Sequence, residues 1–166
     1  MSFRPAANSS LVLTTVLVSA TLLASATLFL FLSYQNRGRG GIHYVFLFTG
    51  CLMFCMVAGS LSFRVRSYDI ASGNLVVKVG FGEKVFPLGD LVSVQAEEQP
   101  FAGALREFGV GGVWSYAGRF RSSRLGRFSA YATSTASGVL LTWPDKKLLV
   151  TPQDQTQFLH AVRPGP

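Results

Sequence analysis

Two long apolar stretches occupy the first part of the chain. Residues 11–34 (LVLTTVLVSATLLASATLFLFLSY) and 41–63 (GIHYVFLFTGCLMFCMVAGSLSF) contain no Asp, Glu, Lys or Arg. At about 1.5 Å of rise per residue, roughly 20 apolar residues cross the ~30 Å hydrocarbon core of a bilayer. The connector QNRGRGG (35–41) is short and rich in turn residues. The pattern therefore predicts a transmembrane hairpin with helices over about 11–34 and 42–63.

A signal peptide and a pair of core helices both fit these stretches less well. A cleaved signal peptide would account for the small residues at 24–26, but the apolar run continues beyond them and only Arg4 precedes it. A pair of buried core helices would require two uncharged stretches of this length inside a short chain. We therefore expect both stretches to lie in a membrane.

After Phe63 the hydrophobic pattern changes to alternation with a period of two. In residues 74–81 (NLVVKVGF), the apolar residues on one face are Leu75, Val77, Val79 and Phe81, which is typical of a half-buried strand. Further strands are predicted over 63–69, 91–98, 127–133, 138–143 and 147–151. The segment TPQDQTQFLHAV (151–162) then reads as a helix with Thr151 as its N-cap and with Phe158, Leu159 and Val162 as its apolar stripe.

These patterns divide the chain into two parts. Residues 1–63 are predicted to form the N-terminal hairpin. Residues 64–166 are predicted to form a mainly β domain of six or seven short antiparallel strands, closed by a C-terminal helix as a small barrel.

The composition supports a membrane location. The chain is 49% hydrophobic and only 14% charged, whereas soluble domains carry about 25% charged residues. The net charge is +7. Near the helix ends, the side of the termini carries more bases than the connector: Arg4, Arg64, Arg66 and Lys78 against Arg37 and Arg39. The positive-inside rule then predicts a multi-pass protein of the inner (cytoplasmic) membrane with both termini cytoplasmic.

Small residues recur along the hairpin. Cys51, Cys55 and Gly59 are four residues apart and share one face of the second helix, and Ala20 and Ala24 could offer the matching groove on the first. We interpret the stripe as a helix-packing surface. A metal or redox pair is the alternative, but two cysteines four residues apart at membrane depth are poor evidence for it, and a reducing compartment argues against a structural disulfide.

No arrangement of residues points to catalysis, a cofactor or a metal. The two histidines, His43 and His160, are far apart in the chain, whereas a metal site needs three or four converging ligands. Glu97 and Glu98 are adjacent, so in a strand they point to opposite faces and cannot act as an acid–base pair. We therefore expect the protein not to be an enzyme.

An apolar segment, residues 100–118, is long for a loop. Its large side chains are Phe101, Leu105, Phe108, Trp114 and Tyr116. The first three are predicted to share one face of a short helix that the glycines at 109–112 end. The aromatic residues either complete the barrel core or dock onto the membrane or a neighbouring subunit, where Trp and Tyr are favoured.

A basic run follows at residues 118–127 (GRFRSSRLGR). It contains Arg119, Arg121, Arg124 and Arg127, and no acidic residue occurs between Glu107 and Asp145. The run could protect a solvated strand edge. It could also bind anionic membrane lipids, where each base gains roughly 1 kcal/mol, or an acidic partner subunit. Nucleic acid fits poorly, because the charge is modest and the domain is tethered to a membrane.

The order of these segments resembles the bacterial pleckstrin-homology-like (PH-like) domains. The resemblance covers about residues 62–163 and is most specific over 106–133, with REFG, GRFR and LGRFSAYAT. It implies a split barrel capped by a C-terminal helix, cytoplasmic and membrane-anchored, with no catalytic activity. The candidate first hairpin loop, ASGN (71–74), carries no base, so phosphoinositide recognition is not carried over.

The expected function is that of a membrane-anchored, non-catalytic interaction or scaffold protein. Its partners would be membrane lipids and other membrane-protein subunits, and one concrete form is an accessory subunit of a respiratory or photosynthetic complex. The alternative is a module that senses anionic lipid on its own.

Overall fold

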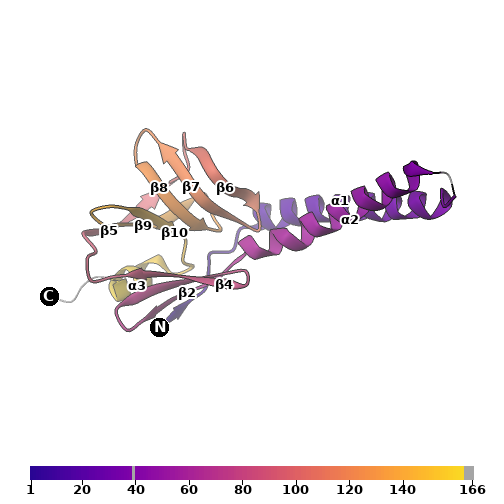
Figure 1. Ribbon diagram of the computed structural model, residues 1–166. Coiled ribbons are helices and arrows are strands. Elements are labelled where there is room, and N and C mark those ends of the chain that lie inside the picture. Colours follow the sequence, from indigo (N-terminus) through magenta and orange to yellow (C-terminus); the bar gives the residue numbers. More distant parts are fainter. Residues whose placement is uncertain (39, 163–166) are drawn as a thin grey trace.

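The chain folds into a helical hairpin that projects from a β-rich domain (Figure 1). The computed structural model describes residues 1–38 and 40–162, and at Val110 the backbone only. Arg39, one of the two connector bases counted above, lies outside the described residues.

The hairpin consists of α1 (Ser9–Gln35) and α2 (Gly41–Ser60), and a 3-10 turn, Leu61–Phe63, follows α2. Asn8 caps α1, since its side chain accepts hydrogen bonds from the backbone N–H groups of Ser10 and Leu11. In the most apolar stretch of 18 residues, only 11% is buried in α1 and only 6% in the second helix. A core helix would be mostly buried, so these are two helices that could span a membrane.

The two helices pack through residues that the sequence pattern did not single out. Ala26 and Gly50 are buried in the contact, and a Cβ added to Gly50 would lie 2.9 Å from Cγ of Leu30. Near the connector, the buried hydroxyl of Ser33 lies 2.8 Å from Nδ1 of His43.

The predicted pairing of the two small-residue stripes with one another is wrong. All five residues face outward: Ala20, Ala24, Cys51, Cys55 and Gly59. The helices turn these faces away because Gly50 and Ala26 already allow the close approach on the opposite side. Whether the stripes contact a helix of another chain remains a prediction.

The β domain contains two sheets. The first has the strand order β1-β2-β3-β4, with β1 (Ser2–Phe3), β2 (Val65–Ala71), β3 (Asn74–Val79) and β4 (Gly82–Pro87). The second has the order β5-β9-β10-β8-β7-β6, with β5 (Ser93–Glu98), β6 (Leu105–Val113), β7 (Ser115–Ser122), β8 (Gly126–Ala132), β9 (Ser137–Thr142) and β10 (Lys147–Val150). The last helix is α3 (Gln155–Val162).

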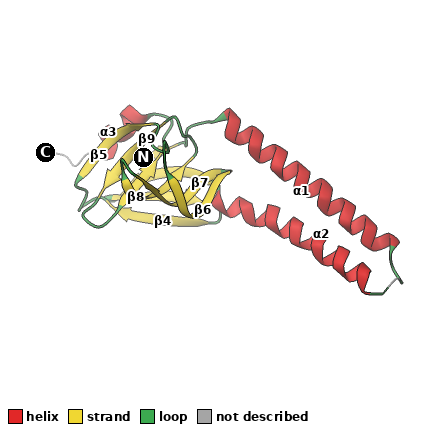
Figure 2. Ribbon diagram, turned by 90° about the horizontal axis from the view of Figure 1, so that it is seen from above, coloured by secondary structure: helices red, strands yellow, loops and turns green. Residues whose placement is uncertain are grey.

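The N-terminal segment belongs to the β domain rather than to the hairpin. Ser2 and Phe3 pair with Asp69 and Tyr68 of β2, and the backbone N–H of Ala6 donates to the carbonyl of Thr151 at 2.8 Å. The predicted division at residue 63 therefore misplaces residues 1–6. Both ends of the hairpin enter the same domain, as Figure 2 also shows.

The main core lies between the two sheets and is closed by α3. Phe158 of α3 is fully buried and meets the ring of Phe3 edge-on at a centroid distance of 5.2 Å. Tyr68 is also fully buried, and its hydroxyl donates to the carbonyl of Tyr131 at 2.6 Å. Burial raises the pKa of Tyr68 to about 12, so this phenol stays neutral at any physiological pH.

The predicted PH-like fold with a capping C-terminal helix is confirmed, but its details differ. Nine strands follow Phe63 in the described part of the chain, not six or seven, and β10 pairs with β8 in parallel. Residues 105–113 form β6 rather than the end of a short helix, because their backbone pairs with β7 and three glycines weaken a helix there. Asp154, not Thr151, caps α3: its side chain accepts from the N–H of Gln157.

Candidate functional site

A junction of hydrogen bonds fixes the β domain to both helices. Trp114 lies at the turn between β6 and β7 with a positive φ of 61°. Its backbone N–H donates to the hydroxyl of Thr15 in α1 at 2.9 Å, and its indole N–H donates to the hydroxyl of Ser60 at the end of α2 at 3.0 Å. The hydroxyl of the buried Ser115 donates to the carbonyl of Phe63.

The junction changes the interpretation of Trp114. The sequence pattern left Trp114 either in the barrel core or on a surface for a partner or lipid, whereas both of its N–H groups are used in the junction inside the chain. Its ring also lies under the guanidinium of Arg64, at 5.4 Å from the centroid. Trp114 therefore holds the β domain at a fixed distance and orientation relative to the two helices of the hairpin.

Removing the two hydroxyl acceptors should loosen this junction without unfolding the domain. In a Thr15→Val/Ser60→Ala variant, the free energy that stabilises the closed junction should fall by about 1–3 kcal/mol, as expected for two hydrogen bonds at about 0.5–1.5 kcal/mol each. We expect faster backbone hydrogen exchange at residues 112–116 and unchanged exchange in α3. Equal exchange at the junction in both proteins would contradict the role assigned to these hydroxyls.

The predicted site residues separate onto two faces of the second sheet. Phe101 and Tyr116 lie on one face, where their rings are 5.0 Å apart and pack in a second core cluster with Phe120 and Phe128. For these two residues the structure supports the core interpretation that the sequence left open.

The other predicted residues share the opposite face. In register, Leu105 pairs with Arg121, Phe108 pairs with Arg119, and Arg121 pairs with Arg127 on β8. Directly paired residues of antiparallel strands point to the same side of a sheet. We call Leu105, Phe108, Arg119, Arg121 and Arg127 the basic face; all five are exposed, Leu105 by 75% and Phe108 by 76%.

Ion pairs divide the arginines into two groups. Arg124 contacts a carboxylate oxygen of Glu97 at 3.1 Å, and Arg127 contacts Glu107 at 3.2 Å. The expectation that the run has no acid nearby is therefore wrong for these two, because the sheet brings Glu97 and Glu107 to them from distant strands. Within the described residues, Arg119 and Arg121 form no ion pair.

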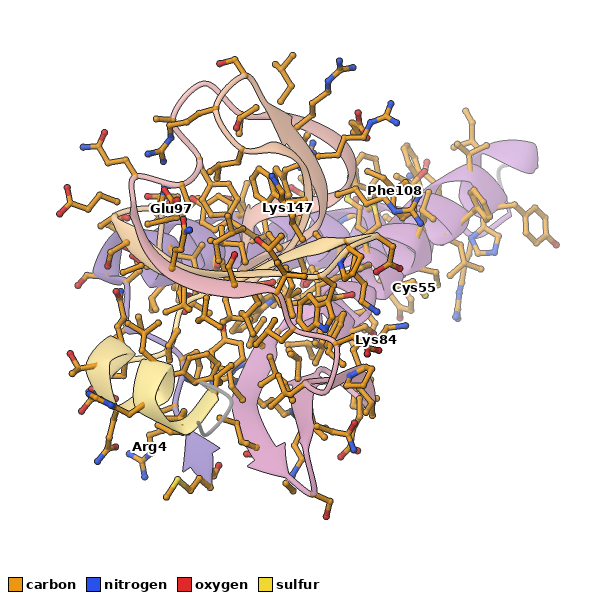
Figure 3. All side chains as sticks on the ribbon, turned by 90° about the vertical axis from the view of Figure 1, so that its left-hand side faces the viewer. Arg4, Cys55, Lys84, Glu97, Phe108 and Lys147 are labelled. Atoms are coloured by element: carbon orange, nitrogen blue, oxygen red, sulfur yellow. The ribbon has the colours of Figure 1, made fainter. Side chains whose placement is uncertain are left out.

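A groove of about 830 Å³ opens between the two sheets beside the end of α2. The wall formed by the second sheet includes Phe108 and Arg119, and the wall formed by the first sheet includes Phe81 and Lys84. Phe63 lies where the groove meets the end of the helix. Figure 3 labels Phe108 and Lys84, which lie on facing sheets. The sequence pattern placed Phe81 on the apolar face of a strand and a turn at residues 80–84, so neither Phe81 nor Lys84 was selected for a site. Phe81 instead lies in the turn between β3 and β4 and is mostly exposed.

The groove carries a net excess of positive charge. Lys84 and Arg119 form no ion pair among the described residues. Glu83 also lines the groove and lies directly opposite Lys78 in the register of β3 and β4. The pKa of Lys78 is raised, mostly by its hydrogen bond with Asp69 and to a smaller extent by the charge of Glu83. Burial raises the pKa of Tyr131, and Arg119 offsets part of that rise, so this phenol adds no negative charge at neutral pH.

The described residues hold no cluster of three His, Cys, Asp or Glu side chains that could bind a metal ion. What the arrangement offers instead is a basic and aromatic surface next to two apolar helices, a combination suited to binding.

Comparison with known families identifies the domain. The profile of the family described as "Bacterial PH domain" matches residues 66–164. The chain belongs to this family. The match begins after the hairpin and so leaves out both helices and the N-terminal segment that completes the first sheet. Neither the curated proteins nor the solved structures contain a match to this chain.

Proposed function

We propose that this chain is a membrane-anchored, non-catalytic interaction protein that presents its PH-like domain at the cytoplasmic surface of the inner membrane. In its finer form, the proposal is an accessory subunit of a multi-subunit membrane complex, of respiratory or photosynthetic type, which it joins through the basic face. Domains of this family are typically binding modules without catalysis, which agrees with such a role.

One observation carries the proposal. Arg119 and Arg121 form no ion pair with the described residues, and they lie beside Leu105 and Phe108, two large apolar side chains that are mostly exposed. Exposed apolar residues mixed with arginine are typical of protein interfaces. The junction at Trp114, which ties the domain to both helices, supports the proposal because it holds this face in a fixed position relative to the hairpin.

A second candidate function is an anionic-lipid module that acts alone. The observation in its favour is the position of the groove, since Ser62 and Phe63 at the end of α2 form part of its lining. Extraction in mild detergent followed by native mass measurement separates the two. A fixed set of co-purifying proteins supports the subunit, and a lone monomer supports the lipid module.

Neutralising Arg119 and Arg121 should abolish association and leave folding intact. The Arg119→Gln/Arg121→Gln variant should lose its partner proteins in the native mass measurement, and added salt should reproduce the loss in the wild type. Its stability should change by about 0–1 kcal/mol, because exposed charges contribute little to folding.

The matched control is Arg124→Gln/Lys146→Gln, which also removes two positive charges but from positions outside the basic face, since Arg124 contacts Glu97 and Lys146 lies over the ring of Trp143. It should keep the partner proteins. Equal association by the Arg119→Gln/Arg121→Gln variant and the wild type at low salt would leave these arginines as a solvated strand edge and end the proposal.

A further inference from the structure

The groove has the size and lining of a ligand site. Small-molecule sites in proteins are clefts of about 300–1,000 Å³ with mostly apolar walls and a few placed polar groups. The groove, at about 830 Å³, lies within this range, and its apolar lining includes Phe63, Phe81 and Phe108. Lys84 and Arg119 are the basic groups in it and come from opposite sheets.

The mouth of the groove lies at the level of the membrane surface. The 20 residues of α2 extend about 30 Å, which is the thickness of the hydrocarbon core. Ser62 and Phe63 come directly after this helix and line the groove. Phe81, at the turn between β3 and β4, is 81% exposed, and its backbone neighbour Gly80 donates a hydrogen bond to the carbonyl of Arg64 at 2.7 Å.

The apolar and basic groups follow one another with distance from the membrane. Gly82 of β4 pairs with Val79, and Lys84 lies two residues further along the strand. On the other wall, β7 begins at Ser115, whose hydroxyl contacts Phe63, and Arg119 lies four residues further. A strand rises about 3.3 Å per residue, so both bases lie farther from the end of α2 than Phe63 and Phe81, which form the mouth. Phe108 pairs with Arg119 and lies at the level of the bases.

We propose that this groove binds an acidic amphiphile from the adjacent leaflet, with the anionic head between Lys84 and Arg119 and the apolar chain along Phe63, Phe81 and Phe108. Two cations on facing walls match a phosphate or carboxylate head. An aromatic mouth open to the bilayer matches a hydrocarbon chain that stays in contact with lipid. The ligand adds to the proposed function and rests on it only in sharing Phe108 and Arg119 with the basic face.

The test uses the full chain in phosphatidylcholine vesicles with a trace of phosphatidic acid that carries a photoreactive diazirine. After irradiation and trypsin digestion, the groove appears in two peptides, 79–84 and 107–119. We expect both to be labelled on the order of tenfold more by phosphatidic acid than by phosphatidylcholine with the same diazirine, as two charge contacts predict. Labelling restricted to α1 and α2, or equal for the two lipids, would overturn the proposal.

Variants connect the labelling to the named residues. Lys84→Gln/Arg119→Gln removes the trypsin sites at both positions, so the groove then appears in peptides 79–106 and 107–121. The labelling of these longer peptides should be lower on the order of tenfold. Arg119→Lys, which keeps both the charge and the trypsin site, should retain most of the labelling. Arg124→Gln/Lys146→Gln again serves as the control, with the same change in net charge. If the double groove variant labels like the wild type, the two bases do not hold the head and the proposal falls.

One competitor and one change of sample would identify other occupants of the groove. Inorganic phosphate in excess should not displace the lipid, and full displacement would reduce the groove to a site for free anions. If the groove peptides become labelled only after co-purifying proteins are removed, a protein segment occupies the groove and the lipid proposal is wrong.

The two proposals can fail separately. Arg121 lies on the basic face but not in the groove lining, so Arg121→Gln should weaken association with partner proteins and leave phosphatidic acid labelling unchanged. Labelling that survives in a protein with no partners supports the amphiphile site alone, and partners without labelling support the subunit role alone.

Discussion

Replacing Phe3 with alanine should destabilise the β domain by about 3–5 kcal/mol, the range for removal of a buried phenylalanine. Phe3 is 7% exposed and packs edge-on against Phe158 of α3, although it lies far outside the residues that match the family. Denaturant titration of the full chain in detergent, followed by the fluorescence of the buried Trp143, would measure the change.

Phe81→Ala provides the matched control for this measurement. It removes the same side chain from a position that is 81% exposed and should change the free energy of unfolding by less than about 0.5 kcal/mol, as surface substitutions do. If the two variants unfold at the same denaturant concentration, the N-terminal segment does not contribute to the core in solution.

Replacing Gly80 with alanine should cost about 2–5 kcal/mol, from a backbone conformation that disfavours a Cβ and from an unrelieved contact. Gly80 has a positive φ of 54°, and an added Cβ would overlap the backbone carbonyl of Ser62. The overlap involves main chain on both sides, so no side-chain rotation can relieve it. The same denaturant titration measures the loss.

Gly82→Ala tests the same turn without the overlap. A Cβ on Gly82 would meet nothing nearer than the carbonyl of Val79 at 4.0 Å, so this variant should unfold close to the wild type. In Gly80→Ala we also expect weaker trypsin protection at Arg64 and Arg66, because the turn can no longer rest against the end of α2. Identical behaviour of the two variants would contradict the close approach at Gly80.

The sequence predicted the elements whose pattern is local. The two apolar stretches, the strands β2, β3, β9 and β10 and the terminal helix all follow from periodicity or capping over a few neighbouring residues. The same patterns predicted a small barrel closed by the terminal helix, the family resemblance implied a split barrel with the same cap, and the family match agrees with both.

Contacts between residues that are distant in the chain leave no local pattern in the sequence and were not predicted. Nothing in residues 1–6 has a strand period long enough to detect, yet they complete the first sheet. Likewise, only the fold brings Glu97 to Arg124 and Glu107 to Arg127. In β6, three glycines and two exposed apolar residues looked like a broken helix, because strand pairing with β7 rather than local preference decides the conformation there.

The candidate site was predicted in part. The arginines were selected for their local excess of charge, and Leu105 and Phe108 for their apolar character. The strand register brings three of the arginines together with Leu105 and Phe108 on the basic face. Phe81 and Lys84 were missed because the groove joins two sheets that are separate in the sequence. Trp114 was selected for binding a partner or lipid, and its role in the junction was not predicted because its hydrogen-bond acceptors Thr15 and Ser60 are distant in the chain.

The integration of residues 1–6 into the first sheet makes the hairpin a loop within the β domain. Closing a flexible loop of that length, between Ala6 and Arg64, would cost about 3–4 kcal/mol of chain entropy. In a bilayer, an inserted hairpin would hold these two ends together before the strands pair, so the lipid would lower the entropic cost of folding the β domain. Membrane insertion and β-sheet formation are then thermodynamically linked, and the domain should be most stable when its helices are embedded.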